Sequence, residues 1–390
     1  MAEEQIDHSV FAYLFFAVLF ILRGMEWSGA GFVELELVLL IASGAVFFLK
    51  IYHTYYSVKQ WLLAFFLMVL CCIVYLFSGK QQPVLFVLIV FCLKDTSMEK
   101  LCHTICISSL IVMILSFYLM MMGIRENVVS VVNRSLFGIG YQEYRYALGF
   151  FHANTLFVYC FVAVTSYFFV HKLTRRGFWI SLGMIGLVYN ITKSRTGTLL
   201  LLLFIFCLIP EVRKWMERYM FNPLVPYLMM VYISSNLFFS FMYQYDADNW
   251  LNLLDKAMQQ RISLSHYYLT KYSIKLWGQP VELSNWKMSS SLQTDFKMID
   301  NSYVLMLINY GLIFTVLIMS LYFILLRRMC QNHQYKEVLL IIIMLVYGTT
   351  EVLVPNIFIN YSLILVTGLL FPNQGDSIRG RPLIEGGSRI

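Results

Sequence analysis

The chain has 390 residues, of which 59% are hydrophobic, 17% aromatic and 13% charged. Soluble domains carry about 25% charged residues, and a water-soluble fold could not cover so much apolar surface. Composition therefore excludes an ordinary soluble protein and predicts a polytopic membrane protein. The net charge of +7 is spread over short connections between apolar segments, so it encodes orientation and does not indicate nucleic-acid binding.

The apolar segments predict an all-α polytopic membrane protein with about 12 transmembrane helices and one large extracytoplasmic loop. A spanning helix needs about 20 mostly apolar residues, so the shorter segments are alternatively half-spans or re-entrant. The segments lie near residues 9–23, 32–49, 61–78, 83–94, 104–123, 148–170, 177–192, 197–210, 223–243, 303–326, 337–355 and 357–371.

Lys and Arg are more frequent in the connections that would lie inside if the N-terminus is inside. This asymmetry predicts that both termini are cytoplasmic. Residues 1–243 then form about nine helices, 244–302 the extracytoplasmic loop, 303–372 about three more helices, and 373–390 a disordered cytoplasmic tail. The eight cysteines fall within or beside predicted spans, a pattern that favours neither disulfides nor a structural metal.

Polar residues gather where three of these helices begin on the outer side. The stretch RYALGFFHAN holds Arg145, Gly149, His152 and Asn154, and its 145–149–152 spacing predicts one helical stripe with Asn154 on another side. Helix N-termini expose unpaired N–H groups and attract anions. An arginine beside such an end is disfavoured unless an anion binds there, and this argument also applies to Arg195.

Each residue also has a structural interpretation. Arg145 could reach the interface with its long side chain, and His152 could hydrogen-bond inside the bundle. Ser194 is a natural N-cap for the following helix, and the run Asp300-Asn301-Ser302, which precedes Tyr303, consists of favoured caps.

Candidate residues also occur in the outer loop and the last helices. Arg261 and His266 lie on a stretch that resembles an amphipathic helix, where a charged surface face is the ordinary explanation. Glu351 is an acid inside a span and is a candidate partner for one of the arginines. The DxD tripeptide at 246–248 is an isolated motif and carries little weight for metal binding.

Three stretches together resemble one family. ALGFFHAN is similar to a G-x-x-(H/N)-x-N element of the O-antigen ligase and Wzy-type polysaccharide polymerase superfamily, and TKSRTG is similar to its Ser-Arg element. WGQP followed by DNSYVLMLINYG resembles the segment that closes the outer loop in capsule and exopolysaccharide polymerases. The layout, with many spans and one large outer loop late in the chain, is also similar.

The resemblance implies metal-independent glycosyl transfer on the outer leaflet of a bacterial cell membrane, without a cofactor. The substrate would be an undecaprenyl-diphosphate-linked oligosaccharide in the lipid bilayer, and flippase and chain-length-regulator proteins would be the protein partners. The resemblance carries the diphosphate-binding role to Arg145, Arg195 and Arg261.

The remaining candidates divide into bases and further substrate ligands. A histidine or carboxylate must take the proton of the acceptor hydroxyl, and the candidates are His152, His266 and Asp300. Further substrate-binding candidates are Asn154, Ser194, Asn301, Tyr303 and Glu351. The alternatives are a ligase that moves a finished glycan to a different acceptor, a transporter or flippase, and a structural membrane partner.

Overall fold

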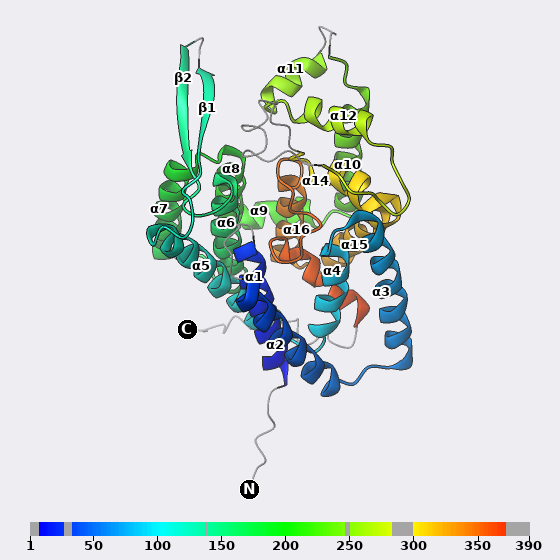
Figure 1. Ribbon diagram of the computed structural model, residues 1–390. Coiled ribbons are helices and arrows are strands. Elements are labelled where there is room, and N and C mark those ends of the chain that lie inside the picture. Colours follow the sequence, from blue (N-terminus) through cyan, green and yellow to red (C-terminus); the bar gives the residue numbers. More distant parts are fainter. Residues whose placement is uncertain (1–7, 27–32, 137–138, 246–249, 283–298, 372–390) are drawn as a thin grey trace, which may run out of the picture. The chain divides into compact units, whose positions relative to one another are not determined.

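The computed structural model describes residues 8–26, 33–136, 139–245, 250–282 and 299–371. Apart from one two-stranded hairpin, the regular elements in these ranges are helices (Figure 1). Five helices are long and apolar enough to cross a membrane, or up to six if the bent pair Arg195–Cys207 and Pro210–Met220 is one span. The described helices therefore fit a mostly helical, membrane-embedded protein. A count of twelve spans stays a prediction, because several apolar helices are shorter than a span.

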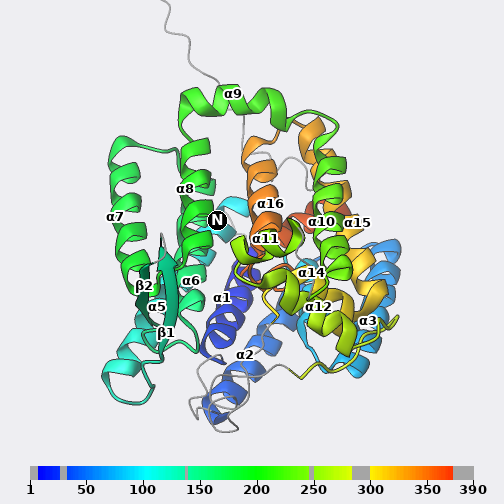
Figure 2. The same cartoon turned by 90° about the horizontal axis from the view of Figure 1, so that it is seen from above.

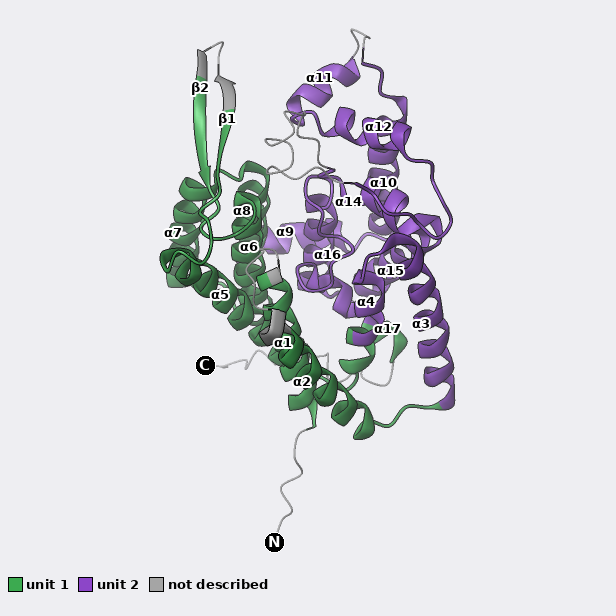
Figure 3. Ribbon diagram, viewed as in Figure 1, with its two compact units in different colours: residues 1–57, 89–209, 367–390 green, residues 58–88, 210–366 purple. Residues whose placement is uncertain are grey.

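The chain folds into two compact units (Figure 3). Unit 1 comprises residues 1–57, 89–209 and 367–390, and unit 2 comprises residues 58–88 and 210–366. The units cut across the predicted divisions at 243 and 302, because each unit collects segments that are distant in the sequence. The predicted tail, 373–390, lies outside the described residues.

Unit 1 is built around a helix that is buried on every side. This central helix, α6, packs most extensively against α5 and also contacts α7 and α8, which run side by side in Figure 2. The helices of this unit are α1 (Ser9–Glu26), α2 (Val33–Tyr52), α5 (Met98–Met121), α6 (Ala153–Val170), α7 (Arg175–Thr192), α8 (Arg195–Cys207) and α17 (Thr367–Leu370).

A β-hairpin projects beyond the ends of α6, α7 and α8 in unit 1 (Figure 1). Strands β1 (Val129–Leu136) and β2 (Ile139–Tyr146) pair antiparallel, with Ser130 opposite Arg145. The hairpin is an addition to the predicted all-α membrane fold, with which the mostly helical structure is otherwise consistent. The valines of β1 and the alternating tyrosines of β2 favour extended backbone over helix.

The predicted helical stripe through residues 145, 149 and 152 is wrong. Arg145 lies on β2, Gly149 lies in a turn with φ +86°, and His152 is the N-cap of α6. A Cβ on Gly149 would lie 2.3 Å from the carbonyl oxygen of Ser116 on α5. A close backbone approach therefore requires glycine here, and this contact ends the strand and starts the helix at Ala153.

Unit 2 contains the segment that was predicted to be a long outer loop. Its residues 250–257 and 261–271 are helical, and α12 packs on α10. The elements are α3 (Val58–Ser78), α9 (Pro210–Met220), α10 (Val225–Met242), α11 (Trp250–Ala257), α12 (Arg261–Lys271), α14 (Ser302–Leu305), the π-helix η1 (Met306–Tyr310), α15 (Gly311–Gln331), α16 (Tyr335–Tyr347) and the 3₁₀ helix η2 (Tyr361–Val366). Helix α4 (Gln82–Cys92) crosses the boundary between the units.

The predicted amphipathic helix around Arg261 is divided into two. Gln259 and Gln260 both have positive φ, which ends α11 before α12 begins. The Oδ1 atom of Asp255 accepts hydrogen bonds from the backbone N–H groups of Ile262 and Ser263, at 2.8 and 3.0 Å. An acceptor from α11 thus satisfies two of the amides that open α12.

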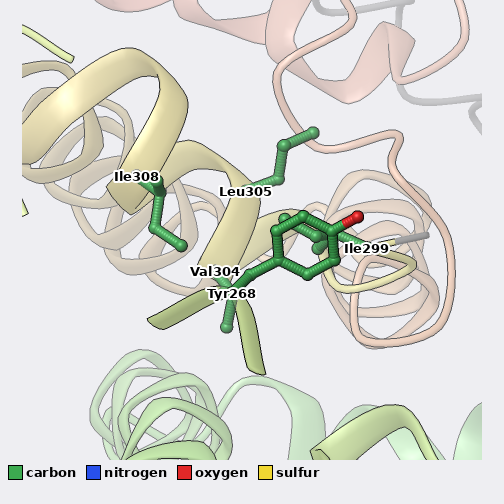
Figure 4. Packing of buried hydrophobic residues seen from close by; sticks show 5 residues of the cluster. All are labelled: Tyr268, Ile299, Val304, Leu305 and Ile308. Atoms are coloured by element: carbon green, nitrogen blue, oxygen red, sulfur yellow. The ribbon is translucent and has the colours of Figure 1, made fainter. Parts of the chain in front are cut away.

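A buried cluster fixes α12 against the start of the long C-terminal helix. Tyr268 packs with Ile299, Val304, Leu305 and Ile308 (Figure 4). This packing holds α12 beside α14 and η1 and so brings Arg261 near the residues that precede α14.

Candidate functional site

Arg145 joins three elements of unit 1. Its Nε donates to the backbone oxygen of Thr192 at 2.8 Å, and its Nη2 donates to Oδ1 of Asn154. These bonds place Arg145 beside the last residue of α7, three residues before Arg195. The expectation that Asn154 faces away from Arg145 is wrong, since the two side chains are in contact.

The position of Arg145 has an electrostatic explanation that the sequence did not reveal. Thr192 is the last residue of α7, and its carbonyl belongs to the negative end of that helix. A cation is favoured at such an end, so Arg145 is not simply an added positive charge at the start of α6. The residue is buried, and its described contacts brace β2 against α6 and α7.

Arg195 opens α8 and is the more accessible arginine. Its Nη2 donates to Oη of Tyr141 at 2.8 Å and lies 3.5 Å from Oε1 of Glu143. The side chain is 43% exposed, and its Nε and Nη1 make no hydrogen bond to any described residue. Ser194 occupies the N-cap position as predicted, but its side chain makes no cap hydrogen bond. The start of α8 therefore offers amide and guanidinium donors to an anion.

The sequence analysis missed Tyr141 and Glu143. Both lie on the face of β2 that carries Arg145, because side chains two residues apart share a face of a strand. The alternation in YQEYRY was the available signal, with Glu143 and Arg145 buried and Gln142, Tyr144 and Tyr146 exposed.

His152 caps α6, just before the apolar helix begins. Its Nδ1 accepts from the backbone N–H of Asn154 at 3.2 Å. Burial, helped by the charge of Arg145, lowers the pKa of His152 from 6.5 to about 4. The imidazole is therefore neutral near pH 7, with its proton on Nε2, and it presents a donor and not a free lone pair.

We expect this cap to make unit 1 sensitive to mild acid. Between pH 6.5 and about 4 the unfolded chain binds a proton at His152 that the folded chain does not, so stability falls as pH falls through this window. His152→Asn keeps a capping side chain without the titration. Melting temperatures in detergent should show the wild type losing more stability than the variant on acidification. A difference between the two proteins that is independent of pH would contradict this expectation.

A second charged cluster lies in unit 2. Nε of Arg261 is 3.8 Å from Oδ2 of Asp300, and its Nη2 is 3.9 Å from Oε1 of Glu351. The predicted pairing of Glu351 with an arginine is thus confirmed, and Arg261 is the partner. One guanidinium therefore lies between two carboxylates.

A small pocket opens beside Arg261. Its lining combines polar and apolar residues and consists of Asn236, Phe239, Ser240, Met258, Arg261, Ile262, Asn301 and Thr349.

The residues that open α14 serve the fold, as the capping interpretation predicted for Asn301. Oδ1 of Asn301 accepts from the backbone N–H groups of Tyr303 and Val304, at 2.9 and 3.3 Å. The Ser302 hydroxyl donates to the backbone oxygen of Glu351 at 2.6 Å, and the Tyr303 hydroxyl donates to the backbone oxygen of Leu345 at 2.5 Å. These bonds attach α14 to α16 and to the residues that follow it.

His266 lies on α12 and contacts α10. Its Nδ1 lies 2.9 Å from the backbone oxygen of Ser240, on α10. A carbonyl oxygen accepts hydrogen bonds and cannot donate them, so Nδ1 carries the proton and neutral His266 keeps a lone pair on Nε2. No described residue is hydrogen-bonded to that nitrogen.

The described residues contain no group of three or more His, Cys, Asp or Glu side chains that could hold a metal ion. Asp246 and Asp248 of the DxD tripeptide lie outside the described residues. Comparison with protein-family models, with curated proteins and with solved structures gave no match for this chain.

Proposed function

We propose that this chain is a membrane glycosyltransferase that polymerises undecaprenyl-diphosphate-linked oligosaccharide units into capsular or exopolysaccharide, without a metal, on the outer leaflet of a bacterial cell membrane. The observation that carries the proposal is the start of α8. Its amides have no side-chain cap, and the guanidinium of Arg195 is 43% exposed beside them. Amide and guanidinium donors at one helix end suit the oxygens of a diphosphate.

The reaction needs little from the protein beyond positioning and charge. The bond between the anomeric carbon and the diphosphate oxygen breaks, and the acceptor hydroxyl oxygen forms the new bond to that carbon. Diphosphate leaves with the bonding electron pair, and Arg195 stabilises its developing charge. The acceptor proton passes to a base.

Hydrogen bonding ranks the three candidate bases. Nδ1 of His152 is occupied by the N–H of Asn154, and Asp300 is paired with Arg261. His266 of unit 2 keeps a lone pair on Nε2, the property that a general base needs.

The two arginines of unit 1 have different tasks in this proposal. Arg145 is buried, and its Nε and Nη2 already bind Thr192 and Asn154. We therefore assign direct contact with the diphosphate to Arg195 and a bracing role to Arg145.

The test is chain growth in a cell-free assay with purified lipid-linked repeat units. Arg195→Lys keeps the charge but loses the planar fork, and we expect its rate to fall by ~10-fold or more, since a hydrogen bond to a charged group is worth ~1.5–3 kcal/mol. Arg213→Lys is the matched control, because Arg213 is also an exposed arginine paired with a glutamate, 2.7 Å from Glu217. Equal rates for wild type and Arg195→Lys would overturn the assignment.

The products of the same assay separate the alternatives. A ladder of lengths is expected for a polymerase, whereas a single transfer to a different acceptor would identify a ligase. Movement of the lipid-linked unit across vesicles without a new glycosidic bond would identify a transporter.

A further inference from the structure

The geometry of β2 points to a role for two side chains that the proposed function has not yet used. We propose that Tyr141 and Glu143 are positioning residues, which hold Arg195 by one nitrogen so that the rest of its guanidinium faces the diphosphate of the lipid-linked substrate. The inference rests on the proposed function and adds the β-hairpin to the substrate site.

The first step is the placement of the two side chains on the strand. Tyr141, Glu143 and Arg145 alternate along β2 and share one face. Arg145 fixes that face, because its bond to Thr192 holds the strand against the end of α7. Thr192 lies three residues before Arg195, so the brace also sets the distance from the strand to the start of α8.

The second step is the way in which Arg195 is held. Both of its described contacts use Nη2, at 2.8 Å to Tyr141 and 3.5 Å to Glu143. No described residue is hydrogen-bonded to Nε or to Nη1. Their N–H groups are therefore left for a ligand. An unattached exposed arginine would lose rotamer freedom on binding, whereas a tethered one has already lost much of it.

The third step distinguishes positioning from base catalysis by Glu143. The carboxylate is 9% exposed and faces a guanidinium. Its Oε1 already accepts from Nη2 of Arg195, so the carboxylate is engaged in holding the guanidinium. Glutamine in place of Glu143 can still accept a hydrogen bond from Arg195, but it cannot act as a base.

The opposite face of the same strand supplies the control. Tyr144 is 51% exposed, and its hydroxyl contacts Gln142 at 3.5 Å, away from Arg195. Tyr141→Phe and Tyr144→Phe each remove one hydroxyl from β2, so they differ in the contact with Arg195 and not in chemistry.

The experiment measures binding of farnesyl diphosphate, a short lipid diphosphate, to the full chain in detergent, and then kcat and KM for chain growth. We expect Tyr141→Phe to weaken binding and raise KM by about 10-fold, near the lower end of the range for one hydrogen bond to a charged group. Glu143→Gln should keep more activity than Glu143→Ala, and Tyr144→Phe should match wild type. In an Arg195→Ala background, Tyr141→Phe should have no further effect, because coupled residues are not additive.

The outcomes separate this inference from the proposed function. If wild type binds no lipid diphosphate and makes no polymer, the proposed function fails. A second outcome is that wild type binds lipid diphosphate and makes polymer, and that Arg195→Ala weakens binding. If Tyr141→Phe then has the same binding and KM as Tyr144→Phe, only the positioning role fails. Glu143→Gln gives a third outcome. If this variant loses kcat and the acid limb of the pH–rate profile while its KM is unchanged, Glu143 is a base and the role assigned here is overturned.

Discussion

Replacing Gly311 or Gly278 by alanine is expected to prevent unit 2 from folding. Both glycines have φ +86°, and each lies against backbone of the other segment. A Cβ on Gly278 would lie 2.0 Å from the oxygen of Asn309, and a Cβ on Gly311 would lie 2.3 Å from the nitrogen of Gly278. Backbone atoms cannot move away by changing a rotamer, so the whole contact must separate.

That contact is also a network of hydrogen bonds. The backbone N–H of Leu312 donates to the backbone oxygen of Lys275 at 3.0 Å, and that of Ile313 donates to the backbone oxygen of Leu276 at 3.2 Å. In the other direction, the backbone N–H of Gln279 donates to the backbone oxygen of Asn309 at 3.0 Å. The segment after α12 thus accepts from amides at the start of α15, where a helix has no acceptors of its own. Separating the contact would leave these groups unpaired next to apolar surroundings, which is costly.

Gly79 provides a control that separates strain from collision. It has φ +70°, and a Cβ there would meet no atom within 4 Å. Gly79→Ala should cost the ~1–2 kcal/mol of a left-handed residue, whereas Gly311→Ala and Gly278→Ala should cost much more. The measurement is the yield of monodisperse protein in detergent and its melting temperature. Similar melting temperatures for Gly79→Ala and Gly311→Ala would show that the backbone contact does not support the fold.

The sequence predicted features that depend on local chemistry. Apolar runs located the helices, because burial in lipid requires a continuous stretch of such residues. Asn301 was predicted as a cap, since an amide side chain before an apolar run satisfies the first N–H groups of a helix. The need of Glu351 for a cation followed from the cost of an unpaired acid within a span.

Features that depend on distant residues could not be predicted in the same way. Thr192 is 47 residues from Arg145, and nothing in the local pattern says that a helix end will lie beside this strand. The hairpin was missed because residues 129–146 were read as a connection between spans. Its alternation of tyrosines with Glu143 and Arg145 is short, and a single arginine fits both a helical and an extended spacing. The pairing of Glu351 with Arg261, in place of another arginine, likewise depends on how α12 packs.

Arg261→Met is expected to destabilise unit 2 rather than to remove a substrate contact. The arginine side chain is 12% exposed and faces Asp300 and Glu351, so its loss leaves two carboxylates without their shared cation. Breaking a buried pair by removing one partner costs about 3–5 kcal/mol. The partial exposure of Asp300 places our expectation at the lower end of that range. Arg213→Met, which breaks the exposed pair with Glu217, should cost less than about 1 kcal/mol.

A second substitution distinguishes the structural role of Arg261 from the diphosphate-binding role that the family resemblance implies. Adding Glu351→Gln to Arg261→Met removes the charge of one of the two carboxylates that faced the arginine, so the double variant should melt at a higher temperature than Arg261→Met alone. A substrate ligand would instead give Arg261→Met a normal melting temperature and weak binding of farnesyl diphosphate. The guanidinium of Arg261 is already engaged by two carboxylates, whereas the donors of Arg195 at the start of α8 favour an anion. Stability should therefore depend on Arg261, and diphosphate binding on Arg195.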